Sequence, residues 1–329
     1  MAESTDVDWA RSFAGYILYF EDLAGFIGGA YGLADSVAAG VHDAVLCRPA
    51  VASISQRPPD ADRAAAIEKA LARSWSHLSR AHAEVNDPIR FDVEANAILP
   101  TIVFNGVGAA AQALAVATHE RSPRGGDAAV ALLRPVVMSG LLPGPWGITC
   151  SGCPQTGTHA FDGLEREARR VDVHAGADAS SSTDRLAMFL RTTRAQRLEL
   201  AYAEARREGL TPGRSRRNVS RVEKEAIAGT VEPTTFFDIL WRTRQESFTD
   251  GVDRFVVGAP GERDARRFAE GLVIVADATV ATIEAVIAAT VGVPLLADMT
   301  EELLERSGIP MWSRLGHHAA SFRARAATL

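Results

Sequence analysis

The chain has 329 residues, 47% of them hydrophobic and 23% charged, so it can bury a sizeable core as one large or two ordinary domains. A formal charge of −6 argues against non-specific affinity of the whole chain for nucleic acid. Three cysteines, a small and odd number, argue against a disulfide scaffold. The acidic, polar N-terminus has no signal-peptide pattern, so a cytoplasmic protein is expected.

The first third of the chain predicts helices. Residues 7–46 carry apolar residues near helical spacing, and their glycines predict two helices rather than one. A proline-containing linker follows at 48–60, and residues 61–85 have the pattern of a strongly amphipathic helix. The stretch 90–119, rich in small and apolar residues, predicts a tightly packed helix that Pro100 starts or kinks.

The rest of the chain alternates between irregular stretches and helices. We expect a short helix at 126–142, a Gly/Pro-rich irregular insertion near 142–185, and a long charged helix at 185–208. Ser220 and Glu223 form a capping-box pattern, Thr235 and Asp238 a similar one, and the latter predicts a helix over 235–250. A last long helix is expected at 262–290.

No stretch shows a convincing strand period, so the predicted fold class is all-α, a multi-helix bundle with a Gly/Pro-rich irregular insertion. Residues 1–60 are interpreted as N-terminal helices and linker, and 61–329 as the bundle, with one continuous domain as the alternative.

The longest apolar run, 268–297, contains Glu270, Asp277 and Glu284. Three carboxylates are costly inside a bilayer, so we expect no membrane span here. Their seven-residue spacing places them on one stripe of a helix, which we interpret as facing solvent. The alternative is a stripe that lines a cation site.

Two cysteines in a tight turn resemble half of a zinc site. Cys150 and Cys153 are followed by His159, six residues on, and a fourth ligand would have to come from a distance. The cofactor hypothesis is therefore a structural zinc. The alternatives are a redox pair or two ordinary cysteines in a loop.

Arginines are concentrated between residues 191 and 224, most densely in one loop. Clustered arginine suits bidentate contact with phosphate, so this segment predicts a nucleic-acid-binding surface for RNA. The alternative is a solvated helix with internal pairs such as Glu204 with Arg207. The candidate nucleic-acid-binding residues are Arg214, Arg216, Arg217 and Arg221.

The helix expected at 235–250 has an apolar start, then Arg242-x-Arg244-Gln245, then Phe248-x-Asp250. This pattern resembles the last core helix of HEPN-like domains, and 90–119 looks like their central helix. The resemblance covers residues 90–290 with an insertion, and it implies a small helical bundle of bacterial toxin–antitoxin or phage-defence type that commonly dimerises.

Active HEPN ribonucleases carry an Arg, a polar residue and then a His. Arg244 and Gln245 match the first half of that motif, but positions 249–251 hold Thr, Asp and Gly. The resemblance therefore implies a catalytically degenerate protein that binds RNA or a protein partner. The first alternative is a metal-independent ribonuclease using Arg244, Gln245 and Asp250, where Asp250 would need a pKa raised by burial. The second is a zinc-stabilised structural protein.

The histidines carry little signal by themselves. We interpret His77 and His82 as polar-face residues of the 61–85 helix. His317 and His318 are interpreted as packed or solvent-exposed, because spacing ties no further ligand to them, and a metal site is the alternative. No phosphate-binding, dinucleotide-binding, HExxH or nucleophile-elbow motif occurs.

Overall fold

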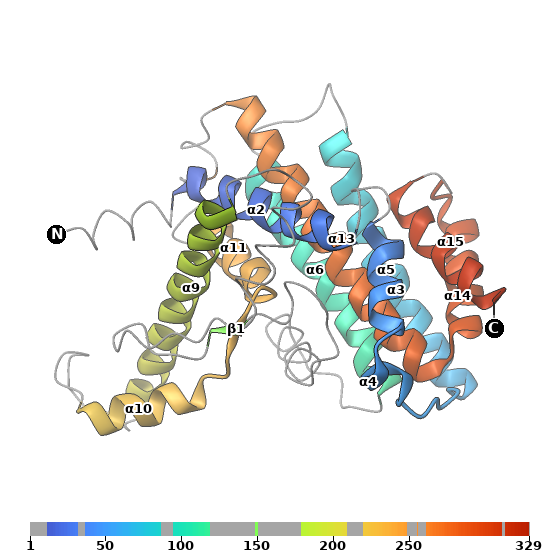
Figure 1. The fold of residues 1–329 in the computed structure, drawn as a ribbon, viewed down its shortest axis with the longest axis horizontal. Coiled ribbons are helices and arrows are strands. Elements are labelled where there is room, and N and C mark those ends of the chain that lie inside the picture. The colour runs from blue at the N-terminus through green and yellow to red at the C-terminus, as the bar shows by residue number, and fades with distance from the viewer. Residues whose placement is uncertain are drawn as a thin grey trace.

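The computed structural model describes residues 12–31, 37–86, 95–118, 149–150, 179–208, 220–248, 255, 261–310 and 313–328. Across these ranges the protein is helical except for one short ladder, which confirms the all-α bundle (Figure 1). The helices are α2 Phe13–Tyr31, α3 Val37–Leu46, α4 Pro49–Ala52, α5 Ala61–Asn86, α6 Ala95–Ala117, α9 Ala179–Arg207, α10 Arg221–Thr230, α11 Asp238–Phe248, α13 Glu262–Val291, α14 Val293–Ser307 and α15 Arg314–Ala326. The ladder pairs β1 Thr149–Cys150 with β2 Thr234–Thr235, antiparallel.

Helix α13 is the centre of the fold. Every residue from 275 to 291 is buried, and α2, α3, α5 and α6 pack around it (Figure 1). A helix that is surrounded on all sides must satisfy its own polar groups. The hydroxyls of Thr279, Thr282 and Thr290 do so by donating to carbonyls four residues earlier.

Small residues let α2 approach α13 closely. A Cβ added at Gly271 would lie 2.9 Å from Cβ of Phe20, and 3.1 Å from its carbonyl carbon. Around this contact Phe13, Phe255 and Phe268 form an edge-to-face cluster. These aromatic contacts hold α2 against α13.

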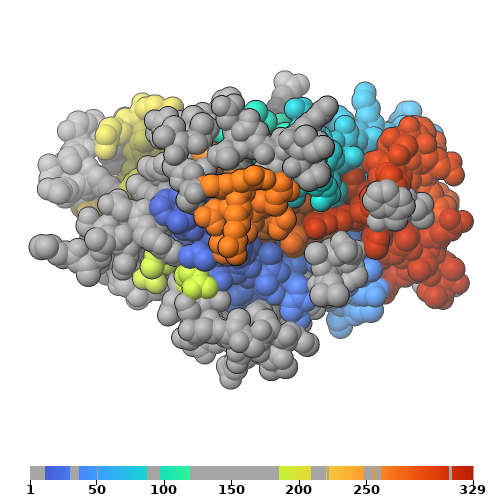
Figure 2. Space-filling model, turned by 90° about the horizontal axis from the view of Figure 1, so that it is seen from above, coloured from blue at the N-terminus to red at the C-terminus, as the bar shows by residue number. Residues whose placement is uncertain are grey.

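The C-terminal helices fold back on the bundle as a hairpin. Gly292, with φ +107°, separates α13 from α14, and Gly308, with φ +65°, ends α14. Ser313 then caps α15 by accepting a hydrogen bond from the amide of Gly316. In the space-filling view α14 and α15 form one end of the molecule (red), and the first turns of α13 reach the surface beside α2 (Figure 2).

Several predicted boundaries are confirmed, and three change. The two N-terminal helices, the helices at 61–86 and 262–291, and the Ser220–Glu223 capping box all occur as predicted. Residues 49–52 of the linker form a short helix, and α9 starts at Ala179, within the segment expected to be a loop. Asp238 is the first helical residue of α11, and its carboxylate accepts from the amide and hydroxyl of Thr235. The helix expected at 126–142 lies outside the described residues.

Two helices, α6 (97–117) and α13, are long and apolar enough to span a membrane by length and composition. Within the fold, 72% and 94% of their apolar windows are buried. Core helices pass the same test, and the burial matches the core helices expected from the sequence.

Candidate functional site

A buried arginine joins α11 to α9. Arg242 is 1% exposed, and its Nη1 donates to the hydroxyls of Thr192 (2.6 Å) and Thr193 (3.0 Å) and to the carbonyl of Phe189 (3.4 Å). Its guanidinium carbon lies 4.5 Å from the centre of the Phe189 ring and 5.5 Å from that of Tyr16. The α9–α11 contact encloses Arg242, although it stands only two residues before the half-buried Arg244.

The same contact raises the pKa of Tyr16 and of Tyr19, since burial disfavours the phenolate more strongly than the Arg242 charge favours it. Both phenols therefore stay neutral at physiological pH. Glu246, one turn after Arg242, lies 3.6 Å from its Nε and offsets the buried charge.

Two further arginines of α9 hold the segment after α10. Arg194 is buried and donates to the carbonyls of Val231 and Glu232. Arg197 donates to the carbonyl of Pro233 and lies 3.6 Å from the carboxylate of Asp238. These two cations satisfy backbone carbonyls next to the end of α10, so they are structural and not available to phosphate.

The remaining arginines of α9 are at the surface. Arg191 is exposed, and so are Arg206 and Arg207, which end the helix just before the arginine-rich loop. Of the candidate RNA-binding residues, Arg214, Arg216 and Arg217 lie outside the described residues, and the side chain of Arg221 does too.

Arg244 and Gln245 are half-buried on α11. The Arg244 guanidinium lies 4.9 Å from the centre of the Phe104 ring on α6, which packs against α11. Asp250, Cys153 and His159 lie outside the described residues, and Cys150 is described only as part of the β1 backbone. Of the predicted ribonuclease residues the structure therefore describes Arg244 and Gln245, and of the predicted zinc ligands only the backbone of Cys150.

The carboxylate stripe of α13 does not face solvent. Glu270 is exposed as expected, but Asp277 is 4% exposed and Glu284 is fully buried. The solvent-facing interpretation was wrong because α3, α5 and α15 cover this side of the helix. Buried carboxylates need partners, and each has them.

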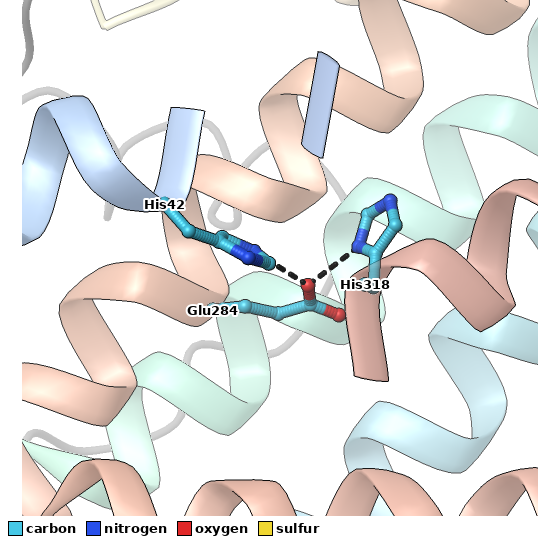
Figure 3. A group of neighbouring side chains, drawn as sticks. All are labelled: His42, Glu284 and His318. Atoms are coloured by element: carbon cyan, nitrogen blue, oxygen red, sulfur yellow. Dashed lines mark hydrogen bonds and ion pairs between the residues drawn. The ribbon is translucent and has the colours of Figure 1, made fainter. Parts of the chain in front are cut away.

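Glu284 is held by three helices. The indole N–H of Trp75 on α5 donates to Oε1 at 2.6 Å, and Nδ1 of His318 on α15 lies 2.6 Å from Oε2. Nε2 of His42 on α3 lies 3.4 Å from the same oxygen. Figure 3 shows both rings pointing at one carboxylate oxygen. The other ring nitrogen of His42 lies 3.1 Å from Oγ of Ser321.

Burial and neighbouring charges shift the pKa values of His42, His318 and Glu284 in different directions. Burial opposes ionisation of His42 and lowers its pKa from 6.5, despite the neighbouring Glu284 carboxylate. Burial also opposes the imidazolium of His318, but the Glu284 carboxylate raises the pKa of that ring. Burial alone would raise the pKa of Glu284, yet the two histidines lower it to about 2. These shifts favour an ion pair of Glu284 with His318 and oppose a charge on His42.

Asp277 has its own partners two turns earlier. Nε2 of His82 on α5 lies 2.8 Å from Oδ1, and Nη1 of Arg314 on α15 lies 3.4 Å from Oδ2. Burial opposes its ionisation, but His82 and Arg314 lower its pKa. His82 is 9% exposed, so its assignment to the polar face was wrong.

A spacing in the sequence matches this arrangement. Asp277 and Glu284 are seven residues apart on α13, and Trp75 and His82 are seven apart on α5. The pairs join in opposite order, Trp75 to Glu284 and His82 to Asp277, as antiparallel helices require. The sequence of either helix alone shows only two polar or aromatic residues seven positions apart. The equal spacing on α5 and α13 is the signal that could have predicted the paired contacts.

Comparison with family models, with curated proteins and with solved structures finds no match to this chain. The HEPN-like resemblance therefore stays a hypothesis, and the site must be interpreted from its own geometry. Within the described residues, His42, Glu284 and His318 place one ligand atom each within 4.8 Å of one another, close enough to share a metal ion.

Proposed function

We propose that this protein is a HEPN-like, catalytically degenerate helical protein that binds RNA along the arginine-bearing end of α9, beside α10. The observation that supports it is the packing of α11 against α6, the two helices that carry the resemblance. Arg244, stacked on Phe104 of α6, is held half-exposed beside Gln245 at that junction.

Under this proposal, phosphate contacts are left to the arginines that do not bind groups of the protein itself. Arg194, Arg197 and Arg242 bind carbonyls, hydroxyls and carboxylates of the protein itself, so phosphate contacts fall to the exposed arginines. Arg206 and Arg207 end α9 and lead into the segment with Arg214, Arg216 and Arg217. Arginine forks match phosphate oxygens bidentately, which suits a short, dense cluster of this kind.

RNA binding is measured with a single-stranded oligonucleotide across a salt series. Neutralised phosphates release counterions, so the slope of log affinity against log salt should fall by roughly 0.7 for each phosphate of a single strand that an arginine no longer neutralises. The variant Arg206→Gln with Arg207→Gln should show this reduction. The matched control, Arg263→Gln with Arg323→Gln, removes two exposed arginines of α13 and α15 and should bind like the wild type.

Absence of binding at low salt, or equal weakening in the control, would overturn the RNA-binding proposal. The alternative of an active ribonuclease is decided in the same assay. If the wild type cleaves the oligonucleotide and Arg244→Ala does not, the protein is an enzyme and its motif is not degenerate.

A further inference from the structure

We propose that His42, Glu284 and His318 form a binding site for one divalent first-row transition-metal ion in the core of the bundle, independent of the cysteine pair. The site uses neither the arginines nor the surface of the proposed function. Its ligand atoms come from α3, α13 and α15, and α3 lies far from the other two helices in the sequence (Figure 3).

The types of donor select the metal class. Two imidazole nitrogens and one carboxylate oxygen suit zinc, iron, cobalt, nickel or copper, whereas magnesium and calcium require mainly oxygen ligands. All three side chains are at most 1% exposed, so bulk water does not compete for them.

An unsatisfied nitrogen atom points to a missing cation. Nε2 of His42, the ring nitrogen that faces Glu284, is buried and has no hydrogen-bond partner among the described residues. When Nδ1–H of His42 donates to Oγ of Ser321, Nε2 presents a lone pair 3.4 Å from the Glu284 carboxylate. Two electron-rich atoms at this distance repel each other, and a metal ion between them would turn the repulsion into coordination.

The distances are close to those of an occupied site. Bonds of about 2.0–2.2 Å in tetrahedral geometry place neighbouring ligand atoms roughly 3.3 Å apart. His42 Nε2 and Glu284 Oε2 already have this separation, at 3.4 Å. His318 Nδ1 lies closer, at 2.6 Å, because a proton now joins it to the carboxylate. Metal binding releases that proton, leaves His318 neutral and needs a ring movement of roughly 1 Å or less by this comparison.

The second layer of contacts orients two of the ligands. Trp75 donates to Oε1 of Glu284 and leaves Oε2 facing the histidines. Ser321 holds Nδ1 of His42 and turns Nε2 inward. Outer hydrogen bonds of this kind fix ring orientation at metal sites and are worth about 10–100-fold in metal affinity.

Cobalt(II) is the probe, because its visible absorption bands report the donor atoms. The full-length protein is stripped with a chelator and titrated with Co²⁺. We expect nitrogen- and oxygen-type bands with one ion per chain, and a rise in Tm in the presence of the ion. Glu284→Gln and His42→Gln should abolish the bands. Trp75→Phe should weaken the affinity by about ten-fold while keeping the spectrum.

Two controls keep the result decisive. Cys150→Ser with Cys153→Ser should leave the bands unchanged, and Asp277→Asn, two turns away, should retain them. Since a core variant can fail to fold, the wild type is tested alone by the Co²⁺-dependent shift in Tm. The proposal is overturned if the wild type shows neither bands nor a shift, if the bands are thiolate charge-transfer bands that disappear in the cysteine variant, or if folded His42→Gln protein binds Co²⁺ as the wild type does.

Discussion

The region around α13 and the contact between α9 and α11 surround their buried charges with different kinds of partner. Around α13 the buried charges are carboxylates, each paired with groups that can themselves be charged, such as His318 and Arg314. Between α9 and α11 the principal buried charge is Arg242, whose hydrogen bonds run to neutral hydroxyls and a carbonyl and whose flat faces meet aromatic rings. Loss of Glu284 therefore leaves a fully buried charged partner behind, whereas loss of Arg242 leaves neutral hydroxyls, a carbonyl and the partly exposed Glu246.

The largest expected effect is that of Glu284→Ala. The substitution leaves the His318 charge and the Trp75 N–H buried without their acceptor, so we expect a loss of about 3–5 kcal/mol in the free energy of unfolding. Urea denaturation of metal-free protein measures it. Glu270→Ala, on the same stripe but exposed, is the control and should unfold close to the wild-type midpoint. A near-neutral Glu284→Ala would contradict the picture of a tightly paired buried carboxylate.

Arg242→Met should cost less, about 2–3 kcal/mol, since hydrogen bonds to a charged group are removed but Thr192 keeps its bond to the Phe189 carbonyl. The same denaturation experiment applies. Arg244→Met, at a half-exposed cation–π contact, is the control and should cost no more than about 1 kcal/mol. If Arg242→Met destabilises as much as Glu284→Ala, the distinction between the two regions fails.

Gly271→Ala tests the contact that joins the two regions. The added methyl group would overlap Phe20 of α2, whose neighbours Tyr16 and Tyr19 lie on the α9 side, so we expect a loss of about 1–2 kcal/mol. Gly229→Ala on the exposed end of α10 meets nothing within 4 Å, and it should stabilise slightly, by about 0.4–1 kcal/mol. Thermal unfolding of both variants gives the comparison. Equal behaviour of the two would mean that α2 can shift freely on α13.

The smallest expected effect is a difference in acid sensitivity. The pKa of the Asp277 carboxyl is lowered below its ordinary 3.8, so its stabilisation is complete above that pH and is lost as the pH falls through the lower folded value. Between about pH 5 and pH 2 the wild type should therefore lose more stability than Asp277→Asn. Parallel losses in both proteins would assign the acid response to other groups.

Much of the fold could be predicted because helix formation depends on local patterns. The amphipathic spacing at 61–86, the apolar run of α13 and the Ser220 capping box all depend on residues within a few turns of each other. The errors at α9 and α11 lie at helix ends, where Thr235 and Asp238 form the predicted local contact but α11 begins three residues later.

The site was harder to predict because its members are close only in three dimensions. His42 and His318 are separated by more than two-thirds of the chain, and neither has a ligand at a recognisable spacing. The stripe of Asp277 and Glu284 was visible, but its direction depends on which helices cover it. A charged stripe faces water on most helices and is buried only when other elements supply partners.

By itself, the amino-acid sequence determined that this chain is helical, where its main helices run and which residues carry charge, because periodicity and capping act over a few residues. Only the tertiary structure decided which charges are buried. Placing α3, α5 and α15 around α13 turned a carboxylate stripe into two paired sites and turned scattered histidines into a cluster of ligands. Packing α11 against α9 enclosed Arg242 and left Arg244 half-exposed, a difference that two nearby positions on one helix do not reveal.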